Sequence, residues 1–381
     1  MRVTGAWLAD PGTQALCAML LRAGHAALFV GGCVRNALLH QPVNDVDIAT
    51  DALPDRVMTL AEETGFQAVA TGLEHGTVTV VVAGVGHEIT TFRRDVQTFG
   101  RRAVVAFSRD VAEDAARRDF TINALYATPD GGVLDPLGGG LHDLAARRVR
   151  FVGDPRQRIV EDYLRILRFF RFQAWYGDDA LGPDPEGLAA CTALAEGVEN
   201  LSRERTGTEM RKLLSAPDPA PAVVAMAEAG VLQRVLPGAS AAALPALIAL
   251  EGDAPIRWQR RLAALGGTDP HLALRLSKRD ARLMAMMATE IAGERGPAEL
   301  GYRHGPWAAA DIVLVRAARA GRPPQTGWRE AIGRGARAEF PLVAADLMPG
   351  LKGPDLGRRL KALEDRWIAS DFRLSRDELL A

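Results

Sequence analysis

The chain has 381 residues, of which 24% are charged, and a formal net charge of −1. This length predicts roughly two to four domains or subdomains. The near-zero net charge gives no overall signal for a nucleic-acid or membrane partner, so any polyanion site must be a local patch. Three cysteines without paired spacing exclude a disulfide framework and a cysteine-based zinc site. No apolar stretch approaches the roughly 20 residues that span a bilayer, so we expect a soluble, cytoplasmic protein.

Up to about residue 150 the sequence mixes short β-rich runs with helices. The runs ALFVG, DVDIAT, TVTVVVAG, HEITTF and RVRFVG are bounded by Gly, Asn, Asp or Pro, as strands are. From about Asp154 onward Ala, Leu, Arg and Glu at helical spacing dominate, interrupted by Pro and Gly clusters. The sequence therefore predicts an α/β or α+β region followed by an all-helical remainder.

The first candidate site is the strand-turn-helix pattern in LFVGGCVRNALL. The run ALFV predicts a buried strand, Gly31–Gly32 a tight turn, and CVRNALL a helix whose first amides face that turn. Such a junction suits an anion, and Arg35 in the first turn of the helix suits a phosphate. A glycine turn taken alone is more often plain packing.

Two aspartates follow in NDVDIAT, where Asp45 and Asp47 flank Val46. A strand places residues i and i+2 on one face, and two carboxylates that close favour a divalent cation such as Mg²⁺. Glu88, in GHEITTFR, lies in a strand-like run that could complete the carboxylate set of two-metal phosphoryl transfer. The alternatives are a polar edge strand for the aspartates and a surface position for Glu88.

The segment EDAARRDFTINALYA carries Arg117 and Arg118, followed by Asp119. Asp119 or Thr121 suits the start of a helix as its cap. Capping does not explain the two arginines, because adjacent guanidinium groups repel each other and suit a bound triphosphate or ribose-phosphate better than a core.

The segment DPRQRIVEDYLRILRFFRFQAWYG predicts an amphipathic helix that begins near Pro155 and stops near Gly177. One interpretation of its charged half is a solvated face of ion pairs between Glu161, Asp162 and Arg165. The other is that Asp162 and Arg165, an acceptor and a bidentate donor one turn apart, read the edge of a nucleobase.

Five ordered motifs, GGCVRNALL...DVDIAT, RRDFTINAL, DPLGGGLHDL, EDYLRILRFFRF and SRERTGTEM, resemble those of the bacterial class II tRNA nucleotidyltransferases. These are the CCA-adding enzymes and their relatives, the bacterial poly(A) polymerases. The motifs cover roughly residues 26–212, and residues 350–380 are similar more weakly. The resemblance implies an α+β fold: a polymerase-β-like head of mixed sheet and helices (1–152), a helical neck that recognises the base (153–215), a helical body (216–290) and a helical tail that binds tRNA (291–381).

The resemblance also implies roles for single residues. Asp45 and Asp47 match the metal ligands, and Glu88 is the further candidate for a catalytic carboxylate. The residues assigned to the nucleotide are Gly32, Arg35, Arg118, Asp119, Asp162, Arg165, Arg168 and Arg171.

Within that set, Gly32 and Arg35 match the triphosphate site, and Arg118 and Asp119 match ribose and phosphate contacts. Asp162 and Arg165 match the base-reading pair, and Arg168 and Arg171 continue along the same helix. Glu204 and Arg205 match a motif that supports the base-reading helix. Asn36 departs from the family, which usually has aspartate there, but the expected metal ligands remain.

The implied activity is template-independent addition of CMP and AMP from CTP and ATP to the tRNA 3′ end, with Mg²⁺ and without an obligate protein partner. The sibling alternatives are a poly(A) polymerase, a CC-adding enzyme and an A-adding enzyme. A long segment between the first two motifs (92–118) favours completion of the terminal A, and the mixed charge of the tail favours tRNA.

Three other classes are disfavoured. Intact aspartates argue against a non-catalytic RNA-binding protein, and the long helical remainder argues against an antibiotic-type nucleotidyltransferase. The dipeptide His142-Asp143 superficially suggests a metal-dependent phosphohydrolase, but the other histidines show no clustered metal-ligand spacing.

Overall fold

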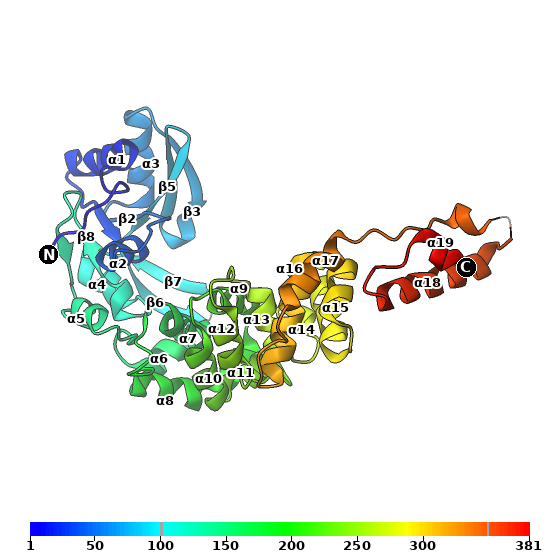
Figure 1. Cartoon of the computed structure of the whole chain (residues 1–381). Coiled ribbons are helices and arrows are strands. Elements are labelled where there is room, and N and C mark those ends of the chain that lie inside the picture. Colours follow the sequence, from blue (N-terminus) through cyan, green and yellow to red (C-terminus); the bar gives the residue numbers. More distant parts are fainter. Residues whose placement is uncertain (100–101, 349) are drawn as a thin grey trace. The chain divides into compact units, whose positions relative to one another are not determined.

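A computed structural model describes residues 1–99, 102–348 and 350–381 (Figure 1). The chain divides into two compact units, Met1–Val235 and Leu236–Ala381. The first unit combines a mixed sheet with helices, and the regular elements described in the second unit are helices. The predicted α+β fold is therefore confirmed. No described helix combines the length and the apolar character that a membrane span requires.

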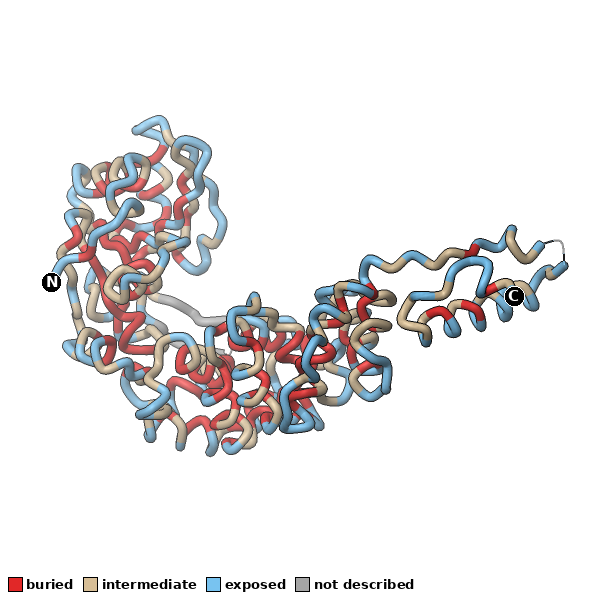
Figure 2. The backbone as a smooth tube through the Cα atoms, in the orientation of Figure 1, coloured by how far each residue is buried: buried red, intermediate tan, exposed pale blue. Residues whose placement is uncertain are grey.

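The main sheet of the first unit has the strand order β3-β4-β5-β2-β1-β8-β9. Neighbouring strands are antiparallel, except that β2 pairs with β5 in parallel. The centre of the sheet is apolar on both faces, with all three residues of β1 buried, and Figure 2 shows this buried centre. The strands are β1 (Leu28–Val30), β2 (Asp47–Thr50), β3 (Gln67–Gly72), β4 (Thr77–Val82), β5 (Val85–Thr91), β8 (Tyr126–Ala127) and β9 (Val133–Leu134).

A separate hairpin of β6 (Arg93–Phe99) and β7 (Arg102–Phe107) follows β5. The other elements of this region are helical: α1 (Pro11–Arg22), α2 (Gly32–Leu38), α3 (Pro54–Glu63), η1 (Leu73–His75), α4 (Val111–Ala116), η2 (Thr121–Asn123) and α5 (Gly140–Ala145). The run RVRFVG, expected as a strand, forms only an isolated bridge between Phe151 and Phe120. That bridge brings their rings within 4.9 Å, so the segment contributes to packing and does not extend the sheet.

The helical part of the first unit consists of α6 (Pro155–Glu161), α7 (Leu164–Tyr176), α8 (Pro185–Ala193), η3 (Ala195–Asn200), α9 (Arg203–Leu214), α10 (Ala220–Glu228) and α11 (Val231–Val235). Aromatic rings join it to the sheet region, because Phe169 of α7 stacks on Phe151 at 5.5 Å and Phe172 lies 5.1 Å from Phe120. The expectation of one helix from Pro155 to Gly177 is wrong. Asp162 is extended (φ −153°, ψ 106°), so the chain changes direction between α6 and α7.

The second unit contains α12 (Leu244–Glu251), α13 (Trp258–Leu265), α14 (Pro270–Ala273), α15 (Lys278–Ala292), α16 (Pro297–Arg319), α17 (Trp328–Arg337), η4 (Ala344–Leu347), α18 (Gly353–Ala369) and α19 (Arg376–Leu380). Helix α16 kinks at Gly305, immediately before Pro306, because proline removes a helical hydrogen bond. The predicted all-helical remainder is confirmed.

Candidate functional site

The three carboxylates expected at the metal site lie around one cavity. Asp47 is the first residue of β2, and Glu88 of the parallel strand β5 is its register partner. A cavity of about 540 Å³ is lined by residues 44–47 and 85–88, which include Asp45 as well. Asp45 precedes the strand, so the alternation of strand side chains does not explain its place beside Asp47. The irregular segment that leads into β2 brings the two aspartates to the same cavity.

The carboxylates around this cavity give it an excess of negative charge. Asp47 is exposed to solvent on one side, but the surrounding protein atoms partly desolvate it and raise its pKa; the neighbouring Glu88 and Asp45 raise the pKa further, whereas Arg118 lowers it. The net pKa shift is upward, so the nearby cation does not offset the other effects. Among the described residues, no group of three or more His, Cys, Asp or Glu side chains is arranged as a ready-made metal centre.

The glycine turn follows the buried strand as the sequence predicts. Gly31 has φ 73° and ψ −118°, a conformation that residues with a Cβ rarely adopt, and α2 begins at Gly32. A Cβ on Gly31 would lie 3.4 Å from Nη1 of Arg118. That distance is an ordinary van der Waals contact, so the positive φ is what favours glycine here, and the closeness of Arg118 places the RRD segment beside the strand-turn-helix.

Arg35 is more deeply buried than the sequence indicates, with only 6% of the residue exposed. Its guanidinium lies 4.0 Å from the ring centre of Tyr176, and Nη2 donates to the Tyr176 hydroxyl at 2.8 Å. Nε donates to Oδ1 of Asn36 at 3.1 Å, and Nη1 donates to Oδ1 of Asn123. Asn36 thus accepts a hydrogen bond from Arg35, whereas an aspartate at this position would form an ion pair with the same arginine. Arg35 joins α2 to the last turn of α7.

Asp114 is a site residue that the sequence reasoning missed. It is 1% exposed, and its carboxylate pairs with Nε of Arg117 at 2.8 Å and with Nη2 of Arg118 at 3.0 Å. The Tyr126 hydroxyl donates to it at 2.5 Å and accepts from Nε of Arg118 at 3.1 Å. The repulsion expected between the two arginines is offset by this one buried carboxylate. Its spacing of i,i+3 and i,i+4 from the arginines was the available signal.

Asp119 does not cap a helix, because η2 follows it with Phe120 at the cap position and no side-chain capping bond. Its Oδ1 accepts from Nδ2 of Asn123 at 3.0 Å, and its Oδ2 accepts from Nε of Arg168 at 2.7 Å. Burial alone would raise the pKa of Asp119, but the charge of Arg168 and these hydrogen bonds lower it to about 2. The carboxylate is therefore ionised and holds Arg168 in place.

Asp162 and Arg165 lie on either side of the break between α6 and α7. Oδ1 of Asp162 accepts from the Leu164 amide at 3.1 Å, and Oδ2 accepts from Nη2 of Arg205 at 2.5 Å. Arg165 donates to the Arg158 carbonyl at 2.7 Å and pairs with Glu161. The ion pair expected between Asp162 and Arg165 is absent from the pairs found in the described residues. The support expected from the SRERTGTEM motif is present as the Arg205–Asp162 ion pair.

Arg168 and Arg171 are held by carboxylates from different parts of the first unit. Arg168 pairs with Asp119, and Arg171 pairs with Glu209 of α9 at 2.6 Å. Both guanidinium groups lie over the ring of Phe172, at 5.2 and 4.4 Å from its centre. Glu209 was not singled out from the sequence, although it lies five residues after Glu204 in the same motif.

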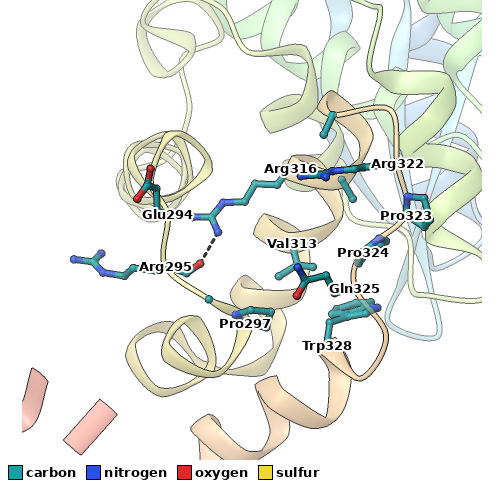
Figure 3. A pocket seen from close by; sticks show the side chains of 13 residues that line it. Glu294, Arg295, Pro297, Val313, Arg316, Arg322, Pro323, Pro324, Gln325 and Trp328 are labelled. Carbon is teal, nitrogen blue, oxygen red and sulfur yellow. Dashed lines mark hydrogen bonds between the residues drawn. The ribbon is translucent and has the colours of Figure 1, made fainter. Parts of the chain in front are cut away.

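A second cavity, of about 560 Å³, lies in the second unit and contains none of these residues. Figure 3 shows Arg316 reaching across it to the carbonyl of Arg295, to which Nη1 donates at 2.5 Å. Arg316 also donates to the Glu290 carbonyl through Nε at 3.0 Å. These contacts satisfy carbonyls near the end of α15, which is a structural role.

Comparison with known proteins shows the family to which the chain belongs. Residues 27–150 match the family model described as "Poly A polymerase head domain", and residues 181–243 match "Probable RNA and SrmB- binding site of polymerase A". The CCA-adding enzyme of Geobacillus thermodenitrificans is 38% identical over 324 residues, which are 80% of this chain and 77% of the relative. The chain belongs to the family of CCA-adding enzymes and poly(A) polymerases. Its resemblance in five motifs is thereby confirmed.

Two further relatives show how much of the chain is similar to known proteins. The CCA-adding enzyme of Levilactobacillus brevis is 44% identical over 214 residues, but the match spans about half of each protein, 56% of this chain and 52% of the relative. The crystal structure of the Bacillus stearothermophilus CCA-adding enzyme in complex with CTP matches 95% of this chain and 94% of that chain. Its TM-score is 0.74 and its identity 31%. The family fold therefore extends over both units.

Proposed function

We propose that this chain is a CCA-adding tRNA nucleotidyltransferase, which transfers CMP and AMP from CTP and ATP to the tRNA 3′ end and releases pyrophosphate. The observation that carries the proposal is the placement of Asp45, Asp47 and Glu88 around one cavity in a chain of this family. The complex of the Bacillus stearothermophilus relative with CTP supports the choice of nucleotide.

We propose that Asp45 and Asp47 hold Mg²⁺, with Glu88 as the third carboxylate. Carboxylate oxygens are the ligands that Mg²⁺ prefers, and the raised pKa of Asp47, caused by partial desolvation and by Glu88 and Asp45, indicates negative charge that a divalent cation would offset. The donor set therefore fits the metal. When bound, Mg²⁺ activates the 3′ hydroxyl and stabilises the departing pyrophosphate.

The arginines and the glycine turn would bind the rest of the nucleotide. Arg118, held by Asp114 against the turn at Gly31, is placed to neutralise phosphate charge, and Gly32 lets the backbone approach. Asp162 would accept a hydrogen bond from the base, and Arg165 would donate one to it. Each side chain would use a lone pair or an N–H group that its present partners do not occupy. The primer hydroxyl would lose its proton as its oxygen attacks the α-phosphate, and the bond to pyrophosphate would break.

The parts of the chain would share the work as the family resemblance implies. We propose that residues 1–152 form the catalytic head and residues 153–215 the neck that recognises the base. Residues 216–290 would form the body and residues 291–381 a tail that contacts tRNA. The enzyme would act in the cytoplasm and need no protein partner.

One assay tests the activity. The full chain is incubated with tRNA that lacks its 3′ CCA, with Mg²⁺, and with CTP and ATP singly and together. Addition of C, C and A that then stops supports the proposal. An unbounded A tail identifies a poly(A) polymerase, and addition of C alone or A alone identifies a sibling enzyme. No incorporation refutes the proposal.

The metal assignment has its own test. Asp45→Ala should abolish incorporation while largely sparing tRNA binding, because in this proposal the aspartate would hold the metal and would not contact the RNA. Asp55→Ala is the matched control, since Asp55 lies in the first turn of α3 and is absent from the lining of the carboxylate cavity. Retained incorporation in Asp45→Ala would refute the role of Asp45.

A further inference from the structure

Asn123 connects residues from two sides of the proposed nucleotide site. It belongs to η2 and is 7% exposed. Its Oδ1 accepts a hydrogen bond from Nη1 of Arg35, which lies in the helix after the glycine turn. Its Nδ2 donates to Oδ1 of Asp119 at 3.0 Å, and the other oxygen of Asp119 accepts from Arg168 of α7. One side-chain amide therefore joins the arginine of the turn to an arginine of α7.

The two partners require a side chain that both accepts and donates a hydrogen bond, as an amide does. Asn123 faces a guanidinium, which only donates, and a carboxylate, which when ionised only accepts. In the observed orientation the amide oxygen accepts from Arg35 and the amide nitrogen donates to Asp119. The flipped amide would place its nitrogen against the guanidinium, a donor against donors, and its oxygen against the carboxylate, an acceptor against an acceptor. An aspartate of the same size would keep the acceptor for Arg35 but would place a second negative charge against Asp119.

Asn123 also restrains the rotation of the Arg35 guanidinium within its own plane, which the aromatic rings leave free. The ring centres of Tyr176 and Phe172 lie 4.0 and 5.3 Å from the guanidinium carbon. A ring over the face of a guanidinium fixes its plane but not its rotation within that plane. Hydrogen bonds set that rotation; Asn36, Asn123 and the Tyr176 hydroxyl provide them, and Asn123 is the partner of Nη1.

We propose that Asn123 is a positioning residue for nucleotide binding, which orients Arg35 directly and Arg168 through Asp119. The inference rests on the proposed function, since it takes both arginines as nucleotide ligands. Asn123 itself has no need to touch the nucleotide. Its loss should therefore weaken the binding of CTP and ATP and leave the affinity for tRNA unchanged.

The test is the dissociation constant for CTP in the presence of Mg²⁺, measured by calorimetry on the full chain. Asn123→Asp should weaken CTP binding about tenfold, because the hydrogen bond to Asp119 is lost and a second negative charge is placed against that carboxylate. Asn123→Ser removes the amide without adding charge and should weaken binding less. The dissociation constant for tRNA lacking CCA should change by less than about twofold in both variants.

Thr121→Val is the matched control for the stability of η2. Thr121 lies in the same turn, and its Oγ1 donates to the buried Asp143 at 2.6 Å, away from Arg35 and Arg168. This variant should bind CTP as the wild type does. Equal weakening in Thr121→Val and Asn123→Asp would overturn the inference, because it would reflect the fold of the turn alone.

Other outcomes separate the inference from the proposed function. If the wild-type chain extends tRNA and Asn123→Asp binds CTP equally tightly, the inference is wrong and the proposed function stands. If the wild-type chain neither binds CTP nor extends tRNA, both fail. Thermal unfolding identifies a variant that does not fold, and Asn123→Ser then carries the same comparison with Thr121→Val.

Discussion

The pKa of Asp119 allows a quantitative prediction, because it reflects how strongly the folded chain stabilises the ionised carboxylate. The side chain is 11% exposed and pairs with Arg168, whose side chain is 30% exposed. Despite the opposing effect of burial, these contacts lower the pKa from 3.8 to about 2. By linkage, that difference corresponds to about 2 kcal/mol of stability for the ionised form.

The sign of the pH dependence follows from the direction of the shift. The pKa is lower in the folded chain, so the contribution is complete above pH 3.8 and is lost as the pH falls toward 2. Asparagine resembles the protonated carboxyl, and Asp119→Asn should therefore remove about 2 kcal/mol from the local stability at neutral pH. The variant lacks this one contribution at every pH, so the difference in stability between the two proteins should shrink as the solution is acidified.

Hydrogen exchange read by mass spectrometry measures this effect where it arises. At pH 7, peptides that cover α7 should exchange roughly 30-fold faster in Asp119→Asn. Peptides from α15 of the second unit provide an internal control and should exchange at the wild-type rate. Calorimetry should show the difference in Tm between the two proteins shrinking from pH 7 to pH 3. Unchanged exchange in α7, or a Tm difference that grows in acid, would refute the reasoning.

Two further predictions concern buried charge and buried thiols. Glu251 is 4% exposed and pairs with Arg260 and Arg261 at 2.7 Å each, so Glu251→Gln should cost about 3 kcal/mol because it removes a buried negative charge that offsets two buried guanidinium groups. Thermal unfolding checks this, and an unchanged Tm would contradict it. Burial raises the pKa of Cys17 to about 12 and of Cys33 to about 11, and Cys191 is buried as well. A thiol reagent at pH 8 should therefore label no cysteine in the native chain and all three after denaturation; rapid native labelling would show that these side chains are accessible.

The parts of the fold that the sequence predicted are those with local signals. The runs that became β1, β2, β4 and β5 carry dense apolar or alternating residues, and Gly31 supplies the positive φ of the turn. The hairpin β6–β7 and the short strands β8 and β9 were not expected, because their pairing partners and not their composition define them. The break at Asp162 was missed because helical periodicity runs on through it.

The candidate site divides in the same way. Residue types and their order predicted which side chains belong to it: two aspartates after a glycine turn, an arginine pair, and a charged helix. Only the tertiary structure decided what holds each charge, since Asp114, Asn123, Tyr176 and Glu209 take their roles from packing. Arg35 and Tyr176 are far apart in the sequence, but Nη2 of Arg35 donates a hydrogen bond to the Tyr176 hydroxyl at 2.8 Å. Periodicity specifies the face of one helix, whereas an ion pair or a stacked ring depends on which elements pack together, and long-range contacts decide that.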